Sequence, residues 1–242
     1  MELRFIHLYP DLMSLYGSYA NVSVLKRYLE RCGHDVTVET VRPGDAAEIA
    51  GADFLYMGAG TERAAGAALE DLRRLSDALR SAAGDGAVSL FAGTAMELLG
   101  ASVTEADGTS RPGLGLGSFT VRRGERRIVG DVYGHTDLFP EPVVGFMNKC
   151  AAISGVETPL LDRLDMGFGN ESEHGPEGFH WKNVFASELT GPVLVKNPRL
   201  LEAVAGAVLA RRGLSLPEER PADEWAERAY TVTEEQLRLR LR

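Results

Sequence analysis

The segment best suited to chemistry is a predicted strand, 87–91, that runs directly into a turn of small residues and a helix. Such an elbow exposes a nucleophile where the helix dipole and free backbone N–H groups stabilise a developing anion. A cysteine there would have its thiolate stabilised in the same way. Here the turn reads Phe91-Ala-Gly-Thr-Ala95, and Thr94 carries its only reactive side-chain atom. The elbow is therefore either the site of a hydroxyl nucleophile or a tight β–α connection in which Thr94 caps the helix.

Three other residues are candidates for altered chemistry or for purely structural roles. Cys150 follows Lys149, whose charge would lower the thiol pKa, but it also follows a predicted strand and so favours a buried structural thiol. His174 lies within, and His180 just after, a glycine-rich segment, 167–178, that is typical of a surface loop. No His, Cys, Asp and Glu spacing is typical of a metal site. We therefore expect no metal and no cofactor.

The elements that must position these residues alternate between strand and helix over the first hundred residues. This rhythm predicts a mostly parallel sheet with helices on both faces. The pattern predicts strands at 3–8, 36–41, 53–57 and 87–91, and amphipathic helices at 22–33 and 69–84.

The second half of the chain follows a different pattern. Residues 118–121 and 127–132 predict a hairpin whose turn is 122–126. Two further strands, at 143–147 and 182–187, and a helix at 200–209 are predicted before Gly213. A Pro- and Glu-rich linker, 215–223, precedes a capping-box pattern that begins at Thr233. We predict one domain over 1–213 and a linker with a C-terminal appendage over 214–242.

The composition is that of an ordinary globular protein. The chain has 242 residues, 44% of them hydrophobic, and a formal net charge of −9. That charge argues against nucleic-acid binding, which needs clustered Lys and Arg. Two cysteines cannot form a disulfide framework, and no apolar run reaches the roughly 18 residues of a membrane span. We therefore expect a cytoplasmic protein with no membrane span.

An ordered series of motifs covers roughly residues 1–210. They are Leu8-Tyr-Pro-Asp-Leu-Met-Ser-Leu-Tyr-Gly17, Met57-Gly-Ala-Gly-Thr-Glu62, Leu98-Leu-Gly100, Val143-Val-Gly-Phe146, Gly167-Phe-Gly-Asn170, Glu177-Gly178 and Gly191-Pro-Val-Leu-Val-Lys-Asn-Pro198. With them the chain resembles the glutaminase subunits of lipid II isoglutaminyl synthases, which are class I glutamine amidotransferases of the cobyric acid synthase-like branch.

The resemblance implies a flavodoxin-like three-layer α/β sandwich with an antiparallel hairpin insertion. It also implies a reaction in which an elbow cysteine attacks the glutamine amide while a histidine moves protons and backbone N–H groups hold the oxyanion. The ammonia would pass to a partner, an ATP-dependent amide ligase of the Mur ligase type, that amidates the peptidoglycan precursor.

The chain departs from this pattern at the reacting groups. The family's Cys-Gly-Gly-Tyr-Gln aligns with Gly93-Thr-Ala-Met-Glu97, so the nucleophile position is Gly93, or Ala92 with a one-residue slip. The Tyr-Leu-His-Gly-Pro motif becomes Glu188-Leu-Thr-Gly-Pro192, which places Thr190 at the histidine position. The Gly-Phe-Glu-Asn-His segment becomes Gly145-Phe-Met-Asn-Lys149. The backbone turn Gly58-Ala-Gly60, the family's oxyanion turn, is kept.

Losing both nucleophile and base removes all but binding and oxyanion assistance. We therefore predict a degenerate subunit, without glutaminase activity, that binds and regulates a partner ligase. Two alternatives stay open. One is an enzyme with altered chemistry that uses Thr94, Cys150 or His180. The other is a module that binds a small amide, glutamine or another amino acid in a pocket formed by Gly58, Ala59, Gly60 and Thr94.

Overall fold

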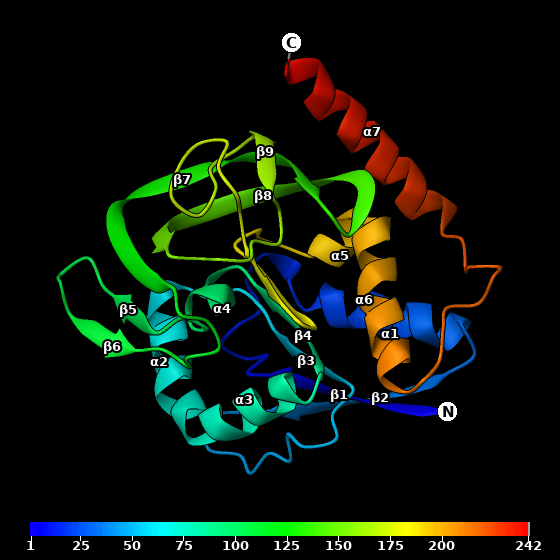
Figure 1. The fold of residues 1–242 in the computed structure, drawn as a ribbon, viewed down its shortest axis with the longest axis horizontal. Coiled ribbons are helices and arrows are strands. Elements are labelled where there is room, and N and C mark those ends of the chain that lie inside the picture. The colour runs from blue at the N-terminus through cyan, green and yellow to red at the C-terminus, as the bar shows by residue number, and fades with distance from the viewer. Residues whose placement is uncertain (242) are drawn as a thin grey trace.

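The computed structural model describes residues 1–241, and its centre is a six-stranded sheet (Figure 1). Its strand order is β10-β11-β4-β3-β1-β2, and all neighbours are parallel except β10 and β11. The central strands are buried on both faces, which explains their continuous apolar runs. The strands are β1 (Glu2–Leu8), β2 (Asp35–Val41), β3 (Phe54–Met57), β4 (Val88–Ala92), β10 (Phe179–Trp181) and β11 (Val184–Ser187).

Helices cover both faces of this sheet, as the alternating pattern predicts (Figure 1). On one face, α1 (Ala20–Arg31) and α6 (Pro198–Arg211) bury Leu25 and Val204 against Phe54. On the other face, α2 (Glu62–Leu72) and α3 (Ser76–Gly84) bury Leu69 and Leu79 against Phe91. A 3₁₀ turn, η2 (Arg73–Leu75), divides the helix that the sequence predicts as continuous. The predicted three-layer α/β sandwich is thus confirmed.

A second, smaller sheet rises from one edge of the sandwich and carries a long hairpin. The order is β6-β5-β7-β8, with β9 paired to β7. The paired strands β7 and β8 are 17 and 16 residues long. The bounds are β5 (Ser102–Thr104), β6 (Ser110–Pro112), β7 (Thr120–Thr136), β8 (Phe139–Ser154) and β9 (Arg163–Met166).

The predicted hairpin exists, but its turn is elsewhere. The chain reverses after Thr136, whereas the charged residues 122–126 lie inside β7, at a register shift between Arg123 and Ile128. The prediction was wrong because a run of arginines and a glycine is typical of an exposed turn. Arg123 is buried instead, because Glu97 and Glu105 bind its guanidinium.

The C-terminal helix α7 (Glu224–Arg240) begins nine residues before the predicted capping box. Asp223 caps it by accepting a hydrogen bond from the N–H of Ala226 at 3.1 Å. The helix packs on the second sheet, where Tyr230 donates a hydrogen bond to the carbonyl of Pro142 and Leu237 is buried (Figure 1). Among the described residues, no helix is long and apolar enough to span a membrane.

Candidate functional site

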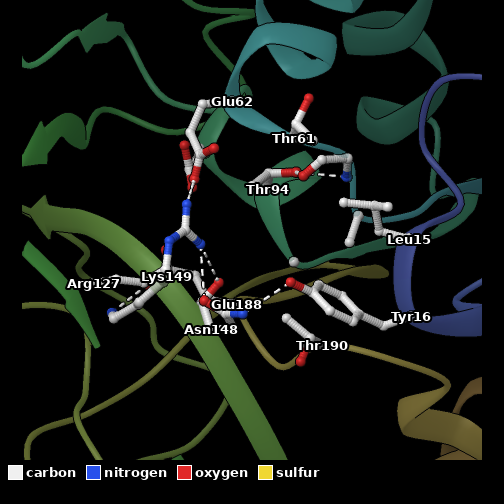
Figure 2. Close-up of a pocket in the computed structure, with 14 residues that line it drawn as sticks. Leu15, Tyr16, Thr61, Glu62, Thr94, Arg127, Asn148, Lys149, Glu188 and Thr190 are labelled. Carbon is white, nitrogen blue, oxygen red and sulfur yellow. Dashed lines mark hydrogen bonds and ion pairs between the residues drawn. The ribbon is translucent and has the colours of Figure 1, made fainter. Parts of the chain in front are cut away.

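A cavity of about 180 Å³ lies at the carboxyl ends of the parallel strands, where α/β sheets bind ligands (Figure 2). The loops after β3, β4 and β11 form one side, and the hairpin of the second sheet forms the other. The residues that line the cavity are Leu15, Tyr16, Ala59, Gly60, Thr61, Glu62, Gly93, Thr94, Glu97, Arg127, Asn148, Lys149, Glu188 and Thr190. The nucleophile and histidine positions of the resemblance, Gly93 and Thr190, therefore line one pocket.

The elbow keeps the backbone of a nucleophile turn. Gly93 has φ 62° and ψ −138°, a conformation that residues with a side chain rarely adopt. It precedes the short helix α4 (Thr94–Glu97), and its N–H donates to the carbonyl of Ser187 at 2.7 Å. A Cβ at Gly93 would lie 2.7 Å from the Cβ of Ala59. The methyl group of Ala59 thus occupies the space into which a nucleophile's side chain would extend.

Thr94 uses its hydroxyl to tie the elbow to the neighbouring turn. Its Oγ1 accepts a hydrogen bond from the N–H of Gly60 at 2.8 Å and donates to the carbonyl of Gly60 at 3.0 Å (Figure 2). The residue does not cap α4, for which Gly93 stands at the cap position without a side-chain bond. The N–H of Gly60, in the turn expected to hold an oxyanion, is consequently already bonded.

Thr190 lies across the pocket and has no basic partner in the described part of the chain. Its hydroxyl donates to the carbonyl of Phe146 at 3.0 Å, and its backbone N–H donates to the same oxygen at 2.8 Å. The position therefore anchors the loop after β11 to strand β8. It offers no group that could accept a proton from a nucleophile at Gly93.

Two buried ion pairs dominate the electrostatics of the pocket. Lys149 pairs with Glu188 and donates to the carbonyl of Gly169, while the Nε of Arg123 lies 2.6 Å from Glu97. All four charged side chains are at most 2% exposed. Burial raises the pKa of both Glu97 and Glu188 to about 7, and their cationic partners offset only part of this shift. Neither Glu97 nor Glu188 stands out in the sequence as a site residue, because periodicity gives no sign of which charges will meet.

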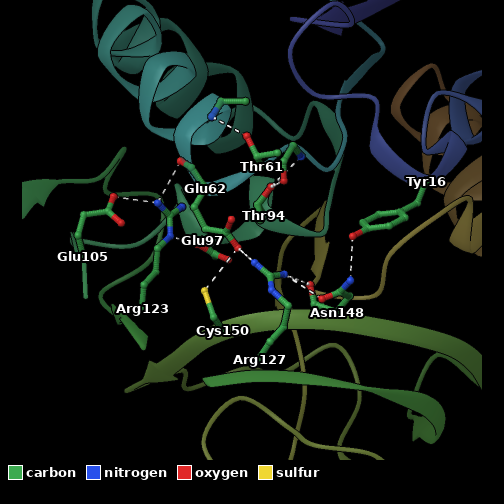
Figure 3. Close-up of polar contacts among 12 residues, drawn as sticks. Tyr16, Thr61, Glu62, Thr94, Glu97, Glu105, Arg123, Arg127, Asn148 and Cys150 are labelled. Atoms are coloured by element: carbon green, nitrogen blue, oxygen red, sulfur yellow. Dashed lines mark hydrogen bonds and ion pairs between the residues drawn. The ribbon is translucent and has the colours of Figure 1, made fainter. Parts of the chain in front are cut away.

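Cys150 faces a carboxylate rather than a cation. Its Sγ lies 3.4 Å from an Oε1 of Glu62, which in turn pairs with Arg127 (Figure 3). Burial, followed by the charge of Glu62, raises the pKa of this thiol to about 11. The expectation that Lys149 lowers the pKa was wrong, because successive side chains of a strand point to opposite faces and Lys149 binds Glu188.

The histidine candidates lie away from the pocket. His180 is in β10, where its ring stacks on Phe185 at 4.7 Å, and burial lowers its pKa. His174 belongs to the glycine-rich loop, where its Nδ1 lies 3.2 Å from the carbonyl of Leu164.

Gly58 packs behind the pocket against Ser18 and Tyr56. Within residues 1–241, no cluster of three or more His, Cys, Asp and Glu is arranged to hold a metal ion.

The chain is similar to proteins of known function. Residues 4–198 match the CobB/CobQ-like glutamine amidotransferase domain. The chain is 32% identical to the lipid II isoglutaminyl synthase (glutamine-hydrolyzing) subunit GatD of Streptococcus pneumoniae, over 87% of this chain and 82% of the relative. It is 27% identical to the GatD subunit of Staphylococcus aureus, over 88% of this chain and 87% of the relative.

A solved glutamine amidotransferase from Thermotoga maritima is similar to the chain in fold. The TM-score is 0.50 and the identity 13%, with 98% of this chain and 95% of that structure covered. At this identity the likeness concerns the fold alone. It agrees with the three-layer sandwich described above.

Proposed function

Because the chain belongs to the CobB/CobQ-like glutamine amidotransferase family, we propose that it is a non-hydrolysing subunit of an enzyme that amidates the peptidoglycan precursor lipid II. The relatives in Streptococcus pneumoniae and Staphylococcus aureus are named as glutamine-hydrolysing subunits of that enzyme. The chain matches them over 87% and 88% of its length. The proposal is that it has exchanged hydrolysis for another use of this pocket.

The contact between Gly93 and Ala59 carries the proposal. A reacting cysteine needs both a Cβ at the elbow and a base nearby, whereas here Ala59 fills the first space and Thr190 stands at the place of the second. Removing nucleophile and base together lowers the rate of a serine protease by about six orders of magnitude, and we expect a loss of similar size here. The bond from the N–H of Gly60 to Thr94 also leaves that donor unavailable to an oxyanion.

The ion pair of Lys149 and Glu188 favours a rebuilt pocket over simple decay. Both residues stand where the family motifs have other side chains, and each would be a costly unpaired charge without the other. The buried lysine and the buried glutamate at these two places therefore depend on each other. Such matched replacement supports a pocket that still has a role.

We propose as the partner an ATP-dependent amide ligase of the Mur ligase type, which the names of the relatives favour because they are subunits of a synthase. We place the contact with the partner at Leu15 and Tyr16, which line the pocket and are 38% and 51% exposed. Tyrosine is enriched at protein interfaces, which favours a partner contact at Tyr16.

The test is a glutaminase assay on the purified chain, alone and mixed with the ligase, with the Streptococcus pneumoniae subunit as the positive control. We expect no glutamate release above the buffer blank in either case. We also expect the ligase to amidate lipid II with ammonium chloride, and to do so better when the chain is present. Glutamate release by the chain would overturn the proposal, as would a ligase indifferent to its presence.

A further inference from the structure

One face of helix α7 holds it against the second sheet. Leu237 is buried there beside Tyr133, and the hydroxyl of Tyr133 donates a hydrogen bond to Glu234 at 2.7 Å. Tyr230 adds the bond to the carbonyl of Pro142. The opposite face points away from the body of the protein, at the edge of the molecule (Figure 1). These contacts fix the orientation of the helix and therefore the residues that it presents outward.

An apolar row runs along this outward face. Trp225, Val232 and Leu239 are seven residues apart, and they are 79%, 52% and 57% exposed. Seven residues make nearly two helical turns, so the three side chains form a row about 21 Å long. Apolar side chains scattered singly over a surface are ordinary, whereas a row at this spacing is typical of a helix that packs against another helix. The row therefore indicates a contact that covers it.

The two borders of the row differ in charge. Arg228 and Glu235 each stand three residues after a member of the row, so at about 100° per residue both lie on the same side of it. Both are exposed, and neither takes part in an ion pair within residues 1–241. The opposite border has the uncharged Ala229 and Gln236, and Arg240 beyond them already has an ion-pair partner. One border thus carries two opposite charges without partners.

From the row and its borders we propose that α7 binds α7 of a second copy of this chain, antiparallel to it, about a two-fold axis at Val232. The tryptophan at one end of each row then packs on the leucine at the other end of its partner, and Val232 meets its own equivalent. A two-fold axis perpendicular to the helices brings equivalent sides together, so the charged borders lie side by side. Each Arg228 stands opposite Glu235 of the second copy, and this ion pair forms twice in the dimer.

The charges distinguish this arrangement from the alternatives. In a parallel pair, the charged side of one helix faces the uncharged side of the other, which leaves Arg228 and Glu235 without partners. A second copy is favoured over the ligase because the row and its charges are complementary to themselves. This contact is independent of the proposed function, since α7 lies outside residues 4–198, which match the family domain, and none of its described residues lines the pocket.

The experiment is sedimentation equilibrium of the full chain at about 1–200 µM and low ionic strength, where exposed ion pairs are least screened. We expect a mass that rises with concentration toward twice that of one chain. The Kd should be about 10–100 µM, because a single helix pair buries less than the roughly 1,200 Å² of a stable interface. A mass that stays that of one chain at the highest concentration would overturn the proposal.

Reversing the charges tests the antiparallel pairing. Arg228→Glu and Glu235→Arg should each weaken dimerisation about tenfold, because two attractive contacts become two repulsive ones. Arg228→Glu/Glu235→Arg exchanges the charges and should restore the Kd of the wild type. This recovery cannot arise within one helix, where ion pairs join residues three or four apart rather than seven. A double variant as weak as the single variants would refute the pairing.

A substitution on the axis tests the location of the interface. Val232→Arg places two arginines against each other and should abolish the dimer. The matched control is Val129→Arg, because Val129 is 58% exposed and lies on β7 rather than α7, and this variant should dimerise like the wild type. A dimer that survives Val232→Arg would overturn the proposal. So would a monomeric chain that loses its binding to the ligase in this variant, because the row would then belong to the ligase.

Discussion

Restoring a side chain at the elbow tests whether Ala59 fills the nucleophile's space. In Gly93→Ala, the new Cβ would lie 2.7 Å from the Cβ of Ala59 and 3.3 Å from its Cα, well inside ordinary van der Waals contact. The alanine at position 93 must also adopt φ 62° and ψ −138°, which costs about 1–3 kcal/mol. Overpacking adds about 1–3 kcal/mol. We therefore expect Gly93→Ala to lower the free energy of unfolding by about 2–6 kcal/mol.

Ala59→Gly separates these two contributions. It removes the clashing methyl but leaves the backbone conformation of Gly93 as it is, so the double variant should recover the overpacking part, about 1–3 kcal/mol. The assay is urea denaturation of the wild type, both single variants and the double variant, analysed as a double-mutant cycle. A coupling energy below about 0.5 kcal/mol would refute the reasoning, because the two positions would then not compete for one space.

Two further predictions follow from the charged groups near the pocket. Because the folded-state pKa values of Glu97 and Glu188 are raised to about 7 from an ordinary 4.5, the folded chain holds more protons than the unfolded chain between these values, and stability should fall as pH rises from about 4.5 to 7. Each carboxyl group changes the free energy of unfolding by at most about 1.4 kcal/mol per pH unit. Glu97→Gln should therefore flatten the dependence of this free energy on pH, measured by urea denaturation. An unchanged slope in this variant would contradict the raised pKa of Glu97. The thiol of Cys150, with a pKa of about 11, should react with iodoacetamide at pH 8 at least tenfold more slowly than an unperturbed cysteine. Glu62→Gln should speed the reaction because it removes the adjacent negative charge. A wild-type rate equal to that of a free thiol would contradict the described burial of Cys150.

The amino-acid pattern by itself determined the central architecture. The apolar runs of β1, β3 and β4 and the helical spacing in α1 and α6 are local signals, and they place the elbow at Gly93 because a strand, small residues and a helix follow one another there. The sequence also shows that Gly93 and Thr190 replace the family's cysteine and histidine, since each motif is a short stretch of sequence. The convergence of both on one pocket follows from the expected fold.

Only the tertiary structure decided what fills that pocket. Ala59 meets Gly93 across 34 residues, and Lys149 meets Glu188 across 39, so no local period or turn signal connects them. The same reason explains the two misplaced elements. Arg123 belongs in a strand because distant carboxylates bind it, and α7 begins at Glu224, capped by Asp223, because its buried face packs on the second sheet. Local sequence sets the elements, whereas long-range contacts set the charge, space and chemistry between them.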